Sequence, residues 1–452
     1  MRGNGMRRFT RRAALLGTAG LLAGCEGIGD TFDSIFGERK RPLPGERKPV
    51  LAIERPLGVD EGEGRPISLP SAEPISDWPQ AGGTLDHSPG NPALGFPLAE
   101  VWRTSVGTGS AYRRRLVAPP IVAADTVYAM DAYGLVTALE AGSGRRRWEL
   151  DTRPEKERDG ALGGGCAFAD GVLYVTTGMA EAMAVDPADG KVRWRVSLPA
   201  PARGAPTVAG GRIFVPTTEN HLLALSVEDG RRLWTYRAQP TVTMVLGLPA
   251  PAVEGETVVA GFGSGELAAI RAVDGRALWS ETLTSARGGG ISDIAAITGM
   301  PVIAENRVFA TGLGGITIAI DLRSGRRLWE REAASTETPW VAGDALFLLT
   351  DNAELACFGR DDGRVRWLRP LGKYEDEKKR RGPITWGAPV LAGGRLLVPG
   401  THARMVELNP TDGEMIGSTR LPGGVALQPA IAKETIYLLT EDAEVVALRG
   451  RG

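Results

Sequence analysis

Short runs of alternating apolar and polar residues, separated by turn residues, fill most of this chain. Residues 205–234 show the pattern in full: four short runs are divided by Gly-Gly, Glu-Asn-His and Glu-Asp-Gly, and the last run ends in Trp. Alternation bounded by Gly, Asn and Asp predicts β-hairpins. No long stretch has the period of an amphipathic helix. The hydrophobic pattern therefore predicts an all-β fold.

One phrase recurs seven times along the chain. It consists of an apolar run, a polar turn that ends in Gly, three further residues and then Trp, which Gly417 replaces in the last copy. The turn glycines are Gly144, Gly190, Gly230, Gly275, Gly325, Gly363 and Gly413. A repeat of this length is typical of propellers and solenoids rather than of unrelated domains.

The number of copies predicts an eight-bladed β-propeller built from four-stranded antiparallel blades. Residues 100–105 supply a Trp-bearing strand before the first phrase, and the last strands end at Leu448 with no such strand after them. The N-terminal strand is therefore expected to complete the C-terminal blade, which closes the ring and removes an exposed sheet edge. Seven blades is the structural alternative.

The recurrent tryptophans are interpreted as structural. A large flat side chain at a fixed offset from a tight turn suits packing between neighbouring blades, whereas a cofactor-stacking residue has no reason to recur in nearly every unit. The residues concerned are Trp102, Trp148, Trp194, Trp234, Trp279, Trp329 and Trp367.

The N-terminus has the features of a bacterial lipoprotein signal. Five arginines precede a short apolar stretch that ends in Leu-Ala-Gly-Cys, which resembles a lipobox and predicts lipidation of Cys25. Residues 1–24 are the predicted signal peptide. Residues 25–76, rich in Pro, Gly and charged residues, are the predicted disordered tether. Residues 77–452 are the predicted propeller.

Two further features near the N-terminus bear on the export route and on the membrane. Residues 10–15 loosely resemble a twin-arginine signal, so export by that route or by the general secretory route stays open. Glu26 follows the lipidation site in place of the Asp associated with inner-membrane retention. This favours the periplasmic face of the outer membrane.

Charge and cysteine content exclude some functions. The formal charge of −1 becomes −6 once the five signal arginines are removed. A mildly acidic domain without a basic cluster argues against nucleic-acid binding. Cys166 and Cys357 fall in units nearly opposite each other, too far apart for a disulfide, and are expected to be buried free thiols.

No catalytic or metal-binding constellation is evident, and neither a cofactor nor a small-molecule substrate is expected. The three histidines, at 87, 221 and 402, are isolated in turns. The recurrent Asp-Gly pairs suit turn backbones better than they suit calcium. The glycine runs 163–165 and 288–290 lack the strand-to-helix context of a phosphate loop and are interpreted as flexible loops.

Connections between strands predict two unlike faces. The turns on one face are uniformly short, whereas the loops after the Trp strands are long and uneven, which is where function is expected on a rigid scaffold. The alternative is that these loops vary in length without having a function. The charge run 374–381 lies in one of these loops, and because its charges nearly cancel, it is interpreted mainly as solvated.

The repeat, seen best at Ala319-Ile-Asp-Leu-Arg-Ser-Gly-Arg-Arg-Leu-Trp329, is similar to the pyrroloquinoline-quinone-type propeller repeat. With the lipobox and a single propeller, the chain resembles the BamB family, lipoprotein subunits of the outer-membrane β-barrel assembly machinery. Residues 77–83, with His87 and Asn91, resemble the alphaproteobacterial form.

The resemblance implies a non-catalytic scaffold that docks through loops of one face onto the periplasmic POTRA domains of the barrel-forming subunit BamA. By motif, Arg203 matches the family's docking arginine and Asp293 its first acidic position. Ala200 and Ala202 stand where the family has leucines, and the second acidic position is Ala295 or Ala296.

Two other functions stay open. The first is a quinone-binding protein related to quinoprotein dehydrogenases, although no adjacent cysteine pair, calcium ligand set or catalytic Asp is identified. The second is a general polypeptide-binding propeller of the periplasm.

Overall fold

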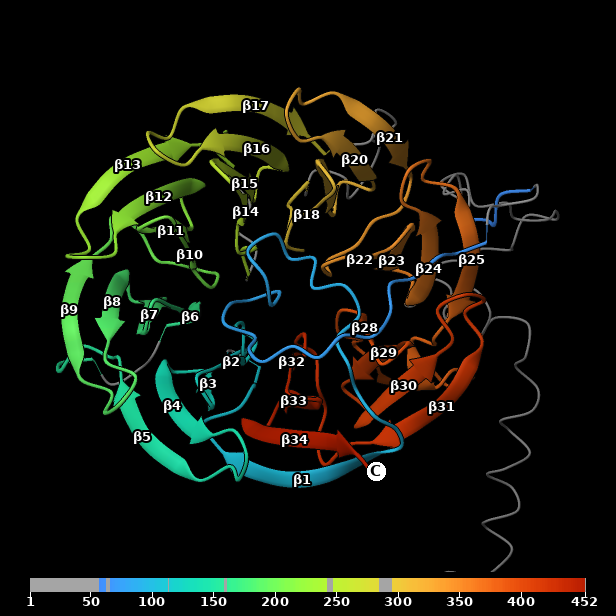
Figure 1. Ribbon diagram of the computed structural model, residues 1–452, viewed down its shortest axis with the longest axis horizontal. Helices are drawn as coiled ribbons and strands as arrows, with labels where there is room; N and C mark the ends of the chain where they lie inside the picture. The colour runs from blue at the N-terminus through green and yellow to red at the C-terminus, as the bar shows by residue number, and fades with distance from the viewer. Residues whose placement is uncertain are drawn as a thin grey trace, which may run out of the picture. The chain divides into compact units, whose positions relative to one another are not determined.

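The computed structural model describes residues 57–61, 66–112, 114–157, 161–241, 247–283 and 295–451. Within this part of the chain, eight four-stranded antiparallel sheets form the blades of a propeller around a common middle (Figure 1). The prediction of eight four-stranded antiparallel blades is therefore confirmed, and seven blades is wrong. No described helix is long and apolar enough to cross a bilayer.

Consecutive strands build the first seven blades, from the innermost strand outward. Blade 1 is β2 (Ile121–Ala123), β3 (Thr126–Met130), β4 (Leu135–Glu140) and β5 (Arg146–Asp151). Blade 2 is β6 (Gly164–Ala169), β7 (Val172–Thr177), β8 (Glu181–Val185) and β9 (Val192–Ser197). Blade 3 is β10 (Thr207–Ala209), β11 (Arg212–Pro216), β12 (His221–Ser226) and β13 (Arg232–Arg237). Blade 4 is β14 (Ala252–Glu254), β15 (Thr257–Gly261), β16 (Glu266–Arg271) and β17 (Ala277–Thr282).

The next blades follow the same order, with one added hairpin. Blade 5 is β18 (Val302–Ala304), β19 (Arg307–Thr311), β20 (Thr317–Asp321) and β21 (Arg327–Arg331). Blade 6 is β22 (Trp340–Ala342), β23 (Ala345–Leu349), β24 (Glu354–Gly359) and β25 (Val365–Pro370). The hairpin of β26 (Tyr374–Asp376) and β27 (Arg381–Pro383) precedes blade 7, which is β28 (Val390–Ala392), β29 (Arg395–Gly400), β30 (Arg404–Leu408) and β31 (Met415–Arg420).

Blade 8 closes the ring with strands from both ends of the propeller. It consists of β32 (Ala430–Ala432), β33 (Thr435–Leu439), β34 (Glu444–Gly450) and β1 (Leu98–Ser105). β1 pairs antiparallel with β34, from Leu98 opposite Gly450 to Ser105 opposite Glu444 (Figure 1). The predicted closure by N- and C-terminal strands is thereby confirmed.

The core lies between neighbouring blades and follows from the strand patterns. The second strands, such as β3 and β23, are buried along their whole length, whereas outer strands such as β13 are largely exposed. A sheet packed on both faces needs apolar residues at successive positions, and an outer strand with one solvated face alternates. The continuous apolar runs and the alternating Trp strands therefore map onto the inside and the outside of the ring.

Each repeated Trp contacts the turn of the next blade along the chain. The indole N–H of Trp194 donates to the carbonyl of Val227 at 3.0 Å, and a Cβ added at Gly230 would lie 2.8 Å from the Trp194 ring. The same pair of contacts recurs seven times, at indole–carbonyl distances from 2.7 to 3.0 Å. The turn glycines have φ between 64° and 76°, the left-handed region that favours glycine.

The exception at Gly417 has a structural reason. Residue 417 lies on β31, next to blade 8, whose outer strands β34 and β1 come from opposite ends of the propeller. No chain turn joins those two strands, so no turn glycine is present for an indole to cover. Instead, Gly450 packs directly against Gly95. A Cβ added at Gly450 would lie 2.4 Å from the carbonyl carbon of Gly95.

A segment before the first strand ties the blades together from the inside. We call residues 75–92 the hub segment; it crosses the middle of the ring (Figure 1). It hydrogen-bonds to the innermost strand or the adjoining turn of each of the eight blades. The residues contacted, from blade 1 to blade 8, are Val122, Phe168, Val208, Val253, Ile303, Trp340, Gly393 and Lys433.

A side chain of the hub segment takes the place of backbone in one of these contacts, and another adds a ring stack. The Gln80 amide donates to the carbonyl of Val208 at 3.1 Å, and its oxygen accepts from the Val208 N–H at 2.8 Å. The ring of Trp78 stacks on that of Trp340, with 6.3 Å between centroids. Both Trp78 and Gln80 are buried. The hub segment is therefore part of the core.

The chain joins the propeller earlier than predicted. The N–H of Asp60 donates to the carbonyl of Val365 on β25 at 3.1 Å, and the N–H of Ser68 donates to the Asp344 carboxylate at 2.7 Å. Residues 57–61 and 66–76 thus bind the blades, although a tether up to residue 76 was expected. The amino-acid composition of residues 57–76 does not predict these contacts, because the partner residues lie more than 270 positions further along the chain. Cys25 and residues 1–56 lie outside the described residues.

The turn glycines offer a matched test of the interblade contact. Gly325 and Gly171 both have φ of 71°, but an added Cβ would meet Trp279 at 2.6 Å in the first case and nothing within 4 Å in the second. Each Gly→Ala change should cost about 1–2 kcal/mol for the left-handed backbone. Gly325→Ala should lose about 1–3 kcal/mol more by overpacking. Equal losses in denaturant unfolding would contradict the contact.

His87 should make the stability of the propeller depend on pH. Burial lowers its pKa from 6.5 to about 4, and Nδ1, which faces the carbonyl of Pro301 at 2.8 Å, carries the proton. Between these pKa values the unfolded chain binds a proton that the folded chain does not, so stability rises with pH over this window by up to about 3 kcal/mol.

The matched variant is His87→Asn, which accommodates the residue's φ of 60° and does not titrate. Unfolding free energies measured from pH 4 to pH 7 should rise more steeply in the parent chain than in this variant. Identical pH profiles would show that His87 does not control this dependence.

Candidate docking face

The two faces of the propeller differ in loop length. On one face the innermost and second strands of every blade are joined by two residues, as at Ala124–Asp125. On the other face the outer strand of one blade leads to the next blade through loops of 8 to 19 residues, the longest being 283–301 and 371–389. We call these the short-turn face and the long-loop face. The predicted contrast between the faces is present in the structure.

Arg203 lies on the long-loop face, in the loop between β9 and β10. Its carbonyl accepts from the N–H of Leu248 at 3.2 Å. An added Cβ at Gly163 would lie 2.2 Å from the carbonyl oxygen of Ala202. The long loops before and after its own thus contact the backbone at Arg203. Its side chain is half-buried, and its Nε is buried without a hydrogen-bond partner among the described residues.

Gly163–Gly165 therefore have a packing role rather than the flexible role expected. Gly164 and Gly165 belong to β6, and an added Cβ at Gly164 would lie 2.0 Å from the carbonyl oxygen of Thr176. Residues 288–290 lie outside the described residues. A glycine run is ambiguous in sequence, because close backbone approach and flexibility both select glycine.

Asp293 lies outside the described residues, in the loop between β17 and β18. This loop returns to the ring at Ala296 and Ile297, both fully buried, and the N–H of Ile297 donates to the carbonyl of Phe262 at 3.1 Å. If Ala296 occupies the family's second acidic position, that position is packed into the propeller. Ala295 covers Gly265, whose added Cβ would lie 2.7 Å from the Cβ of Ala295.

A buried carboxylate holds one long loop in place. Glu266 accepts from the Tyr236 hydroxyl at 2.6 Å and from the N–H of Gln239 at 2.9 Å. The pKa of Tyr236 is raised, first by burial and then by the hydrogen bond to Glu266. Gln239 is the second residue of the loop between β13 and β14, so this network fixes the direction in which the loop leaves blade 3.

A second carboxylate supports the loop between β1 and β2. The Asp131 side chain accepts from the N–H groups of Thr108, Tyr133 and Leu135, each at 2.8 Å. Beyond it, the guanidinium of Arg114 lies 5.0 Å from the centroid of the Tyr133 ring, and Tyr112 is 96% exposed. Tyr112 and Tyr133 leave no periodic signal in the sequence, so their place on this face was not predicted.

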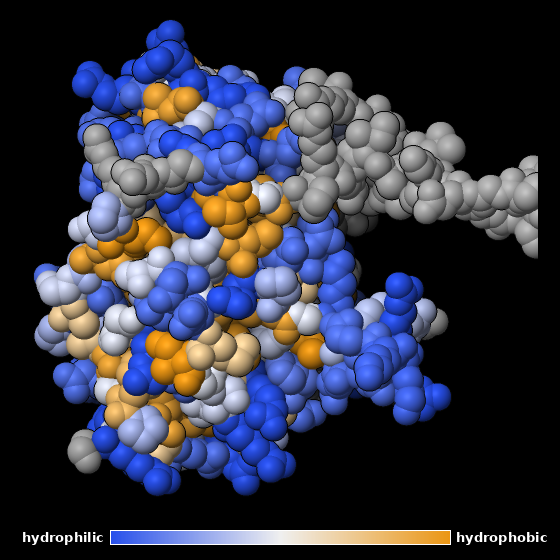
Figure 2. All heavy atoms as spheres, turned by 90° about the vertical axis from the view of Figure 1, so that its right-hand side faces the viewer, coloured by the Kyte–Doolittle hydropathy of each residue, from blue (hydrophilic) through white to orange (hydrophobic). Residues whose placement is uncertain are grey.

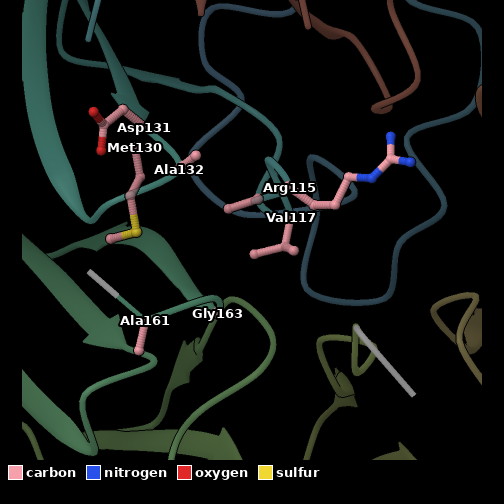
Figure 3. Close-up of a pocket in the computed structure, with 8 residues that line it drawn as sticks. Arg115, Val117, Met130, Asp131, Ala132, Ala161 and Gly163 are labelled. Atoms are coloured by element: carbon pink, nitrogen blue, oxygen red, sulfur yellow. The ribbon is translucent and has the colours of Figure 1, made fainter. Parts of the chain in front are cut away.

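A small recess beside this loop carries no catalytic arrangement. It is lined by Arg115, Met130, Asp131 and Gly163 among others, and the Arg115 side chain points away from the Asp131 carboxylate (Figure 3). Arg115 instead lies 3.5 Å from the carboxylate of Glu441. Across the described ranges, no group of three His, Cys, Asp or Glu side chains could hold a metal ion.

The other chemically reactive residues are engaged in the fold. Cys166 and Cys357 are free and buried, and burial raises the pKa of Cys166 to about 12, so the thiol is neutral and unreactive at physiological pH. In each recurrent Asp-Gly turn the Asp accepts the N–H two residues on, for example Asp229 from Arg231 at 3.0 Å. These carboxylates stabilise turns.

Comparison with known proteins agrees with the architecture. A family model described as "Outer membrane protein assembly factor BamB" matches residues 132–369 and 373–451, more than half of the chain. The chain belongs to the BamB family. The BamB proteins of Yersinia pestis and Escherichia coli are each 27% identical, over 78% of this chain and 89% of theirs. As a member of a family of assembly factors, the chain is not an enzyme.

Solved structures share the fold. The crystal structure of BamB from Moraxella catarrhalis matches 78% of this chain and 100% of its own, with 22% identity and a TM-score of 0.67. A quinohemoprotein alcohol dehydrogenase from Comamonas testosteroni matches with 14% identity and a TM-score of 0.63. At these identities the likeness shows the propeller fold alone. The hub segment lies before the first residue that the family model matches.

The Glu266 network yields a test of loop support. Glu266→Ala would leave the Gln239 N–H and the Tyr236 hydroxyl without their acceptor, which should cost about 1–3 kcal/mol. Amide exchange at 238–241 should accelerate while exchange in β14–β17 stays slow. Unchanged exchange at Gln239 would show that Glu266 does not hold this loop.

Proposed function

We propose that this chain is a lipid-anchored scaffold of outer-membrane protein assembly that binds a partner through the long-loop face of its propeller. The observation that carries the proposal is the membership of the BamB family combined with the contrast between the two faces. A rigid ring that varies its loops on one face only is suited to presenting a fixed binding surface.

The partner proposed is a BamA-like barrel-assembly subunit, bound through its periplasmic POTRA domains. Arg203 supports this assignment, because two neighbouring loops contact the backbone around it and its Nε lacks an acceptor among the described residues. Because the backbone is fixed and the side chain is half-buried, Arg203 loses less entropy than a fully mobile side chain when a carboxylate or carbonyl of a partner binds its guanidinium. Asp293 is proposed as the second contact, on sequence grounds.

Anchoring is proposed at Cys25, with the chain at the periplasmic face of the outer membrane. A lipid on the first residue of the mature chain would keep the propeller close to a membrane-embedded partner. Confinement of this kind raises effective concentration without requiring additional contacts. It suits a docking surface of moderate strength, in which charged residues set orientation and association rate.

Charge reversal at the proposed contacts tests the docking face. Arg203→Glu and Asp293→Arg should each lower recovery of the barrel subunit from detergent-solubilised envelopes by about tenfold or more, because a buried like-charge contact replaces a favourable one. The matched control is Arg231→Glu, which makes the same change in a turn on the short-turn face. Its recovery should stay at the parent level.

The control also decides between docking and other causes of loss. If all three variants lose the partner equally, the loss comes from net charge or misfolding, and the proposed face is wrong. If none of the three variants loses the partner, the long-loop face does not carry the interaction.

A further inference from the structure

The charge run 374–381 is organised differently from what its balanced composition suggests. Two of its three acidic residues are engaged locally, and the third, Glu375, is exposed. Glu377 accepts the N–H groups of Lys373 at 2.6 Å and Tyr374 at 3.1 Å. Asp376 accepts the N–H of Lys379 at 3.0 Å and pairs with its ammonium group at 3.7 Å. Asp376 and Glu377 thus shape the hairpin, whereas Lys378, Arg380 and Arg381 are exposed and have no ion pair among the described residues.

The hairpin stands on a fixed base. The indole N–H of Trp386 donates to the carbonyl of Gly372 at 2.7 Å, and the N–H of Ile384 donates to the carbonyl of Lys373 at 2.9 Å. The Trp386 ring packs edge-on against His402, with 4.8 Å between centroids. The cationic tip is therefore held in position before any ligand arrives.

Two further cations lie on the neighbouring blade. Arg404 on β30 and Arg420 on β31 are direct cross-strand partners, and both are exposed. Like charges placed opposite each other destabilise a sheet, and no carboxylate of the described residues pairs with either. An anion bound between them would remove this repulsion. Arg404 lies near the hairpin, since it and Glu375 both act on the pKa of His402.

The same outer strand exposes apolar side chains. Met415 and Ile416 on β31 are 55% and 48% exposed. Seen from the side of blades 6 and 7, patches of hydrophobic residues interrupt a mainly hydrophilic rim (Figure 2). Unpaired cations beside exposed apolar side chains are typical of surfaces that bind the interface of a membrane with anionic lipids.

The path of the chain supports this orientation. Asp60 is bonded to Val365 on β25, and the charged hairpin directly follows β25. The chain that comes from the N-terminus therefore reaches the propeller on the outer strand next to this surface. The first described residues, 57–61, are therefore attached to blade 6 rather than to the opposite side of the ring.

From these observations we infer that the edge of blades 6 and 7 binds the surface of a membrane that contains anionic phospholipid. We call Lys378, Arg380, Arg381, Arg404 and Arg420 the basic rim; these residues contact lipid phosphates while Met415 and Ile416 enter the headgroup region. The inference draws on the proposed anchor only for orientation. The contacts themselves belong to the propeller.

Vesicle flotation of the mature chain from residue 25, carrying Cys25→Ser so that no lipid is attached, tests the inference. The chain should float with vesicles of phosphatidylcholine and phosphatidylglycerol, and it should not float with phosphatidylcholine alone. Replacement of Lys378, Arg380 and Arg381 by Gln should weaken binding about tenfold or more, because each cation near an anionic surface contributes several-fold. Higher salt should weaken binding in the parent chain.

The matched control replaces three exposed arginines in turns of blades 3, 4 and 5, namely Arg231, Arg276 and Arg326, by Gln. It makes the same change in charge away from the basic rim and should float like the parent chain. Both triple variants change only exposed residues, and equal thermal unfolding midpoints would show that each is folded.

Three results would overturn the inference: no flotation of the parent chain, equal flotation with both lipid compositions, or equal losses in the two triple variants. If the basic-rim variant floats normally but loses the barrel subunit in envelope pull-down, the surface binds protein rather than lipid. Failure of the Arg203 and Asp293 test leaves this result untouched, because flotation requires no partner.

Discussion

The contact between a tryptophan of one blade and the turn glycine of the next is the interaction on which the rest of the structure depends. Each indole covers a left-handed glycine and donates to a carbonyl of the same turn, so it fixes the distance and the angle between two blades at once. Since seven such contacts repeat around the ring, small errors in blade angle do not accumulate. The ring can then close with a strand from each end of the propeller.

The eighth interface is built differently. Here β1 and β34 form the blade from distant parts of the chain, and the close approach of Gly95 and Gly450 stands where a covered turn would be. The hub segment adds a constraint that no other part of the sequence supplies, because it contacts all eight blades from within. A ring that is fixed from outside and from inside provides the rigidity that a docking platform requires.

The sequence predicted the features that repeat and missed those that occur once. Blade number, closure and the two unlike faces follow from the spacing of a phrase that recurs, and the indole contacts use the same residues that define the phrase. The hub segment has no alternation of apolar and polar residues, so the sequence pattern does not predict its position. Its bonds, such as Gln80 to Val208 and Trp340 to Gly90, join residues 128 and 250 positions apart. The hairpin at 374–383 was obscured in a similar way, because counting its charges does not reveal which are engaged by backbone N–H groups.

The central claim is that the long-loop face, rather than the short-turn face, meets the partner. Site-specific photocrosslinking in living cells tests it most directly, with the crosslinker placed in turn at Tyr112 and Arg203 on the long-loop face and at Lys191 and Arg231 on the short-turn face. The account predicts adducts with a barrel-assembly subunit from the first pair alone. Adducts with that subunit from Lys191 or Arg231, and none from Tyr112 or Arg203, would contradict it.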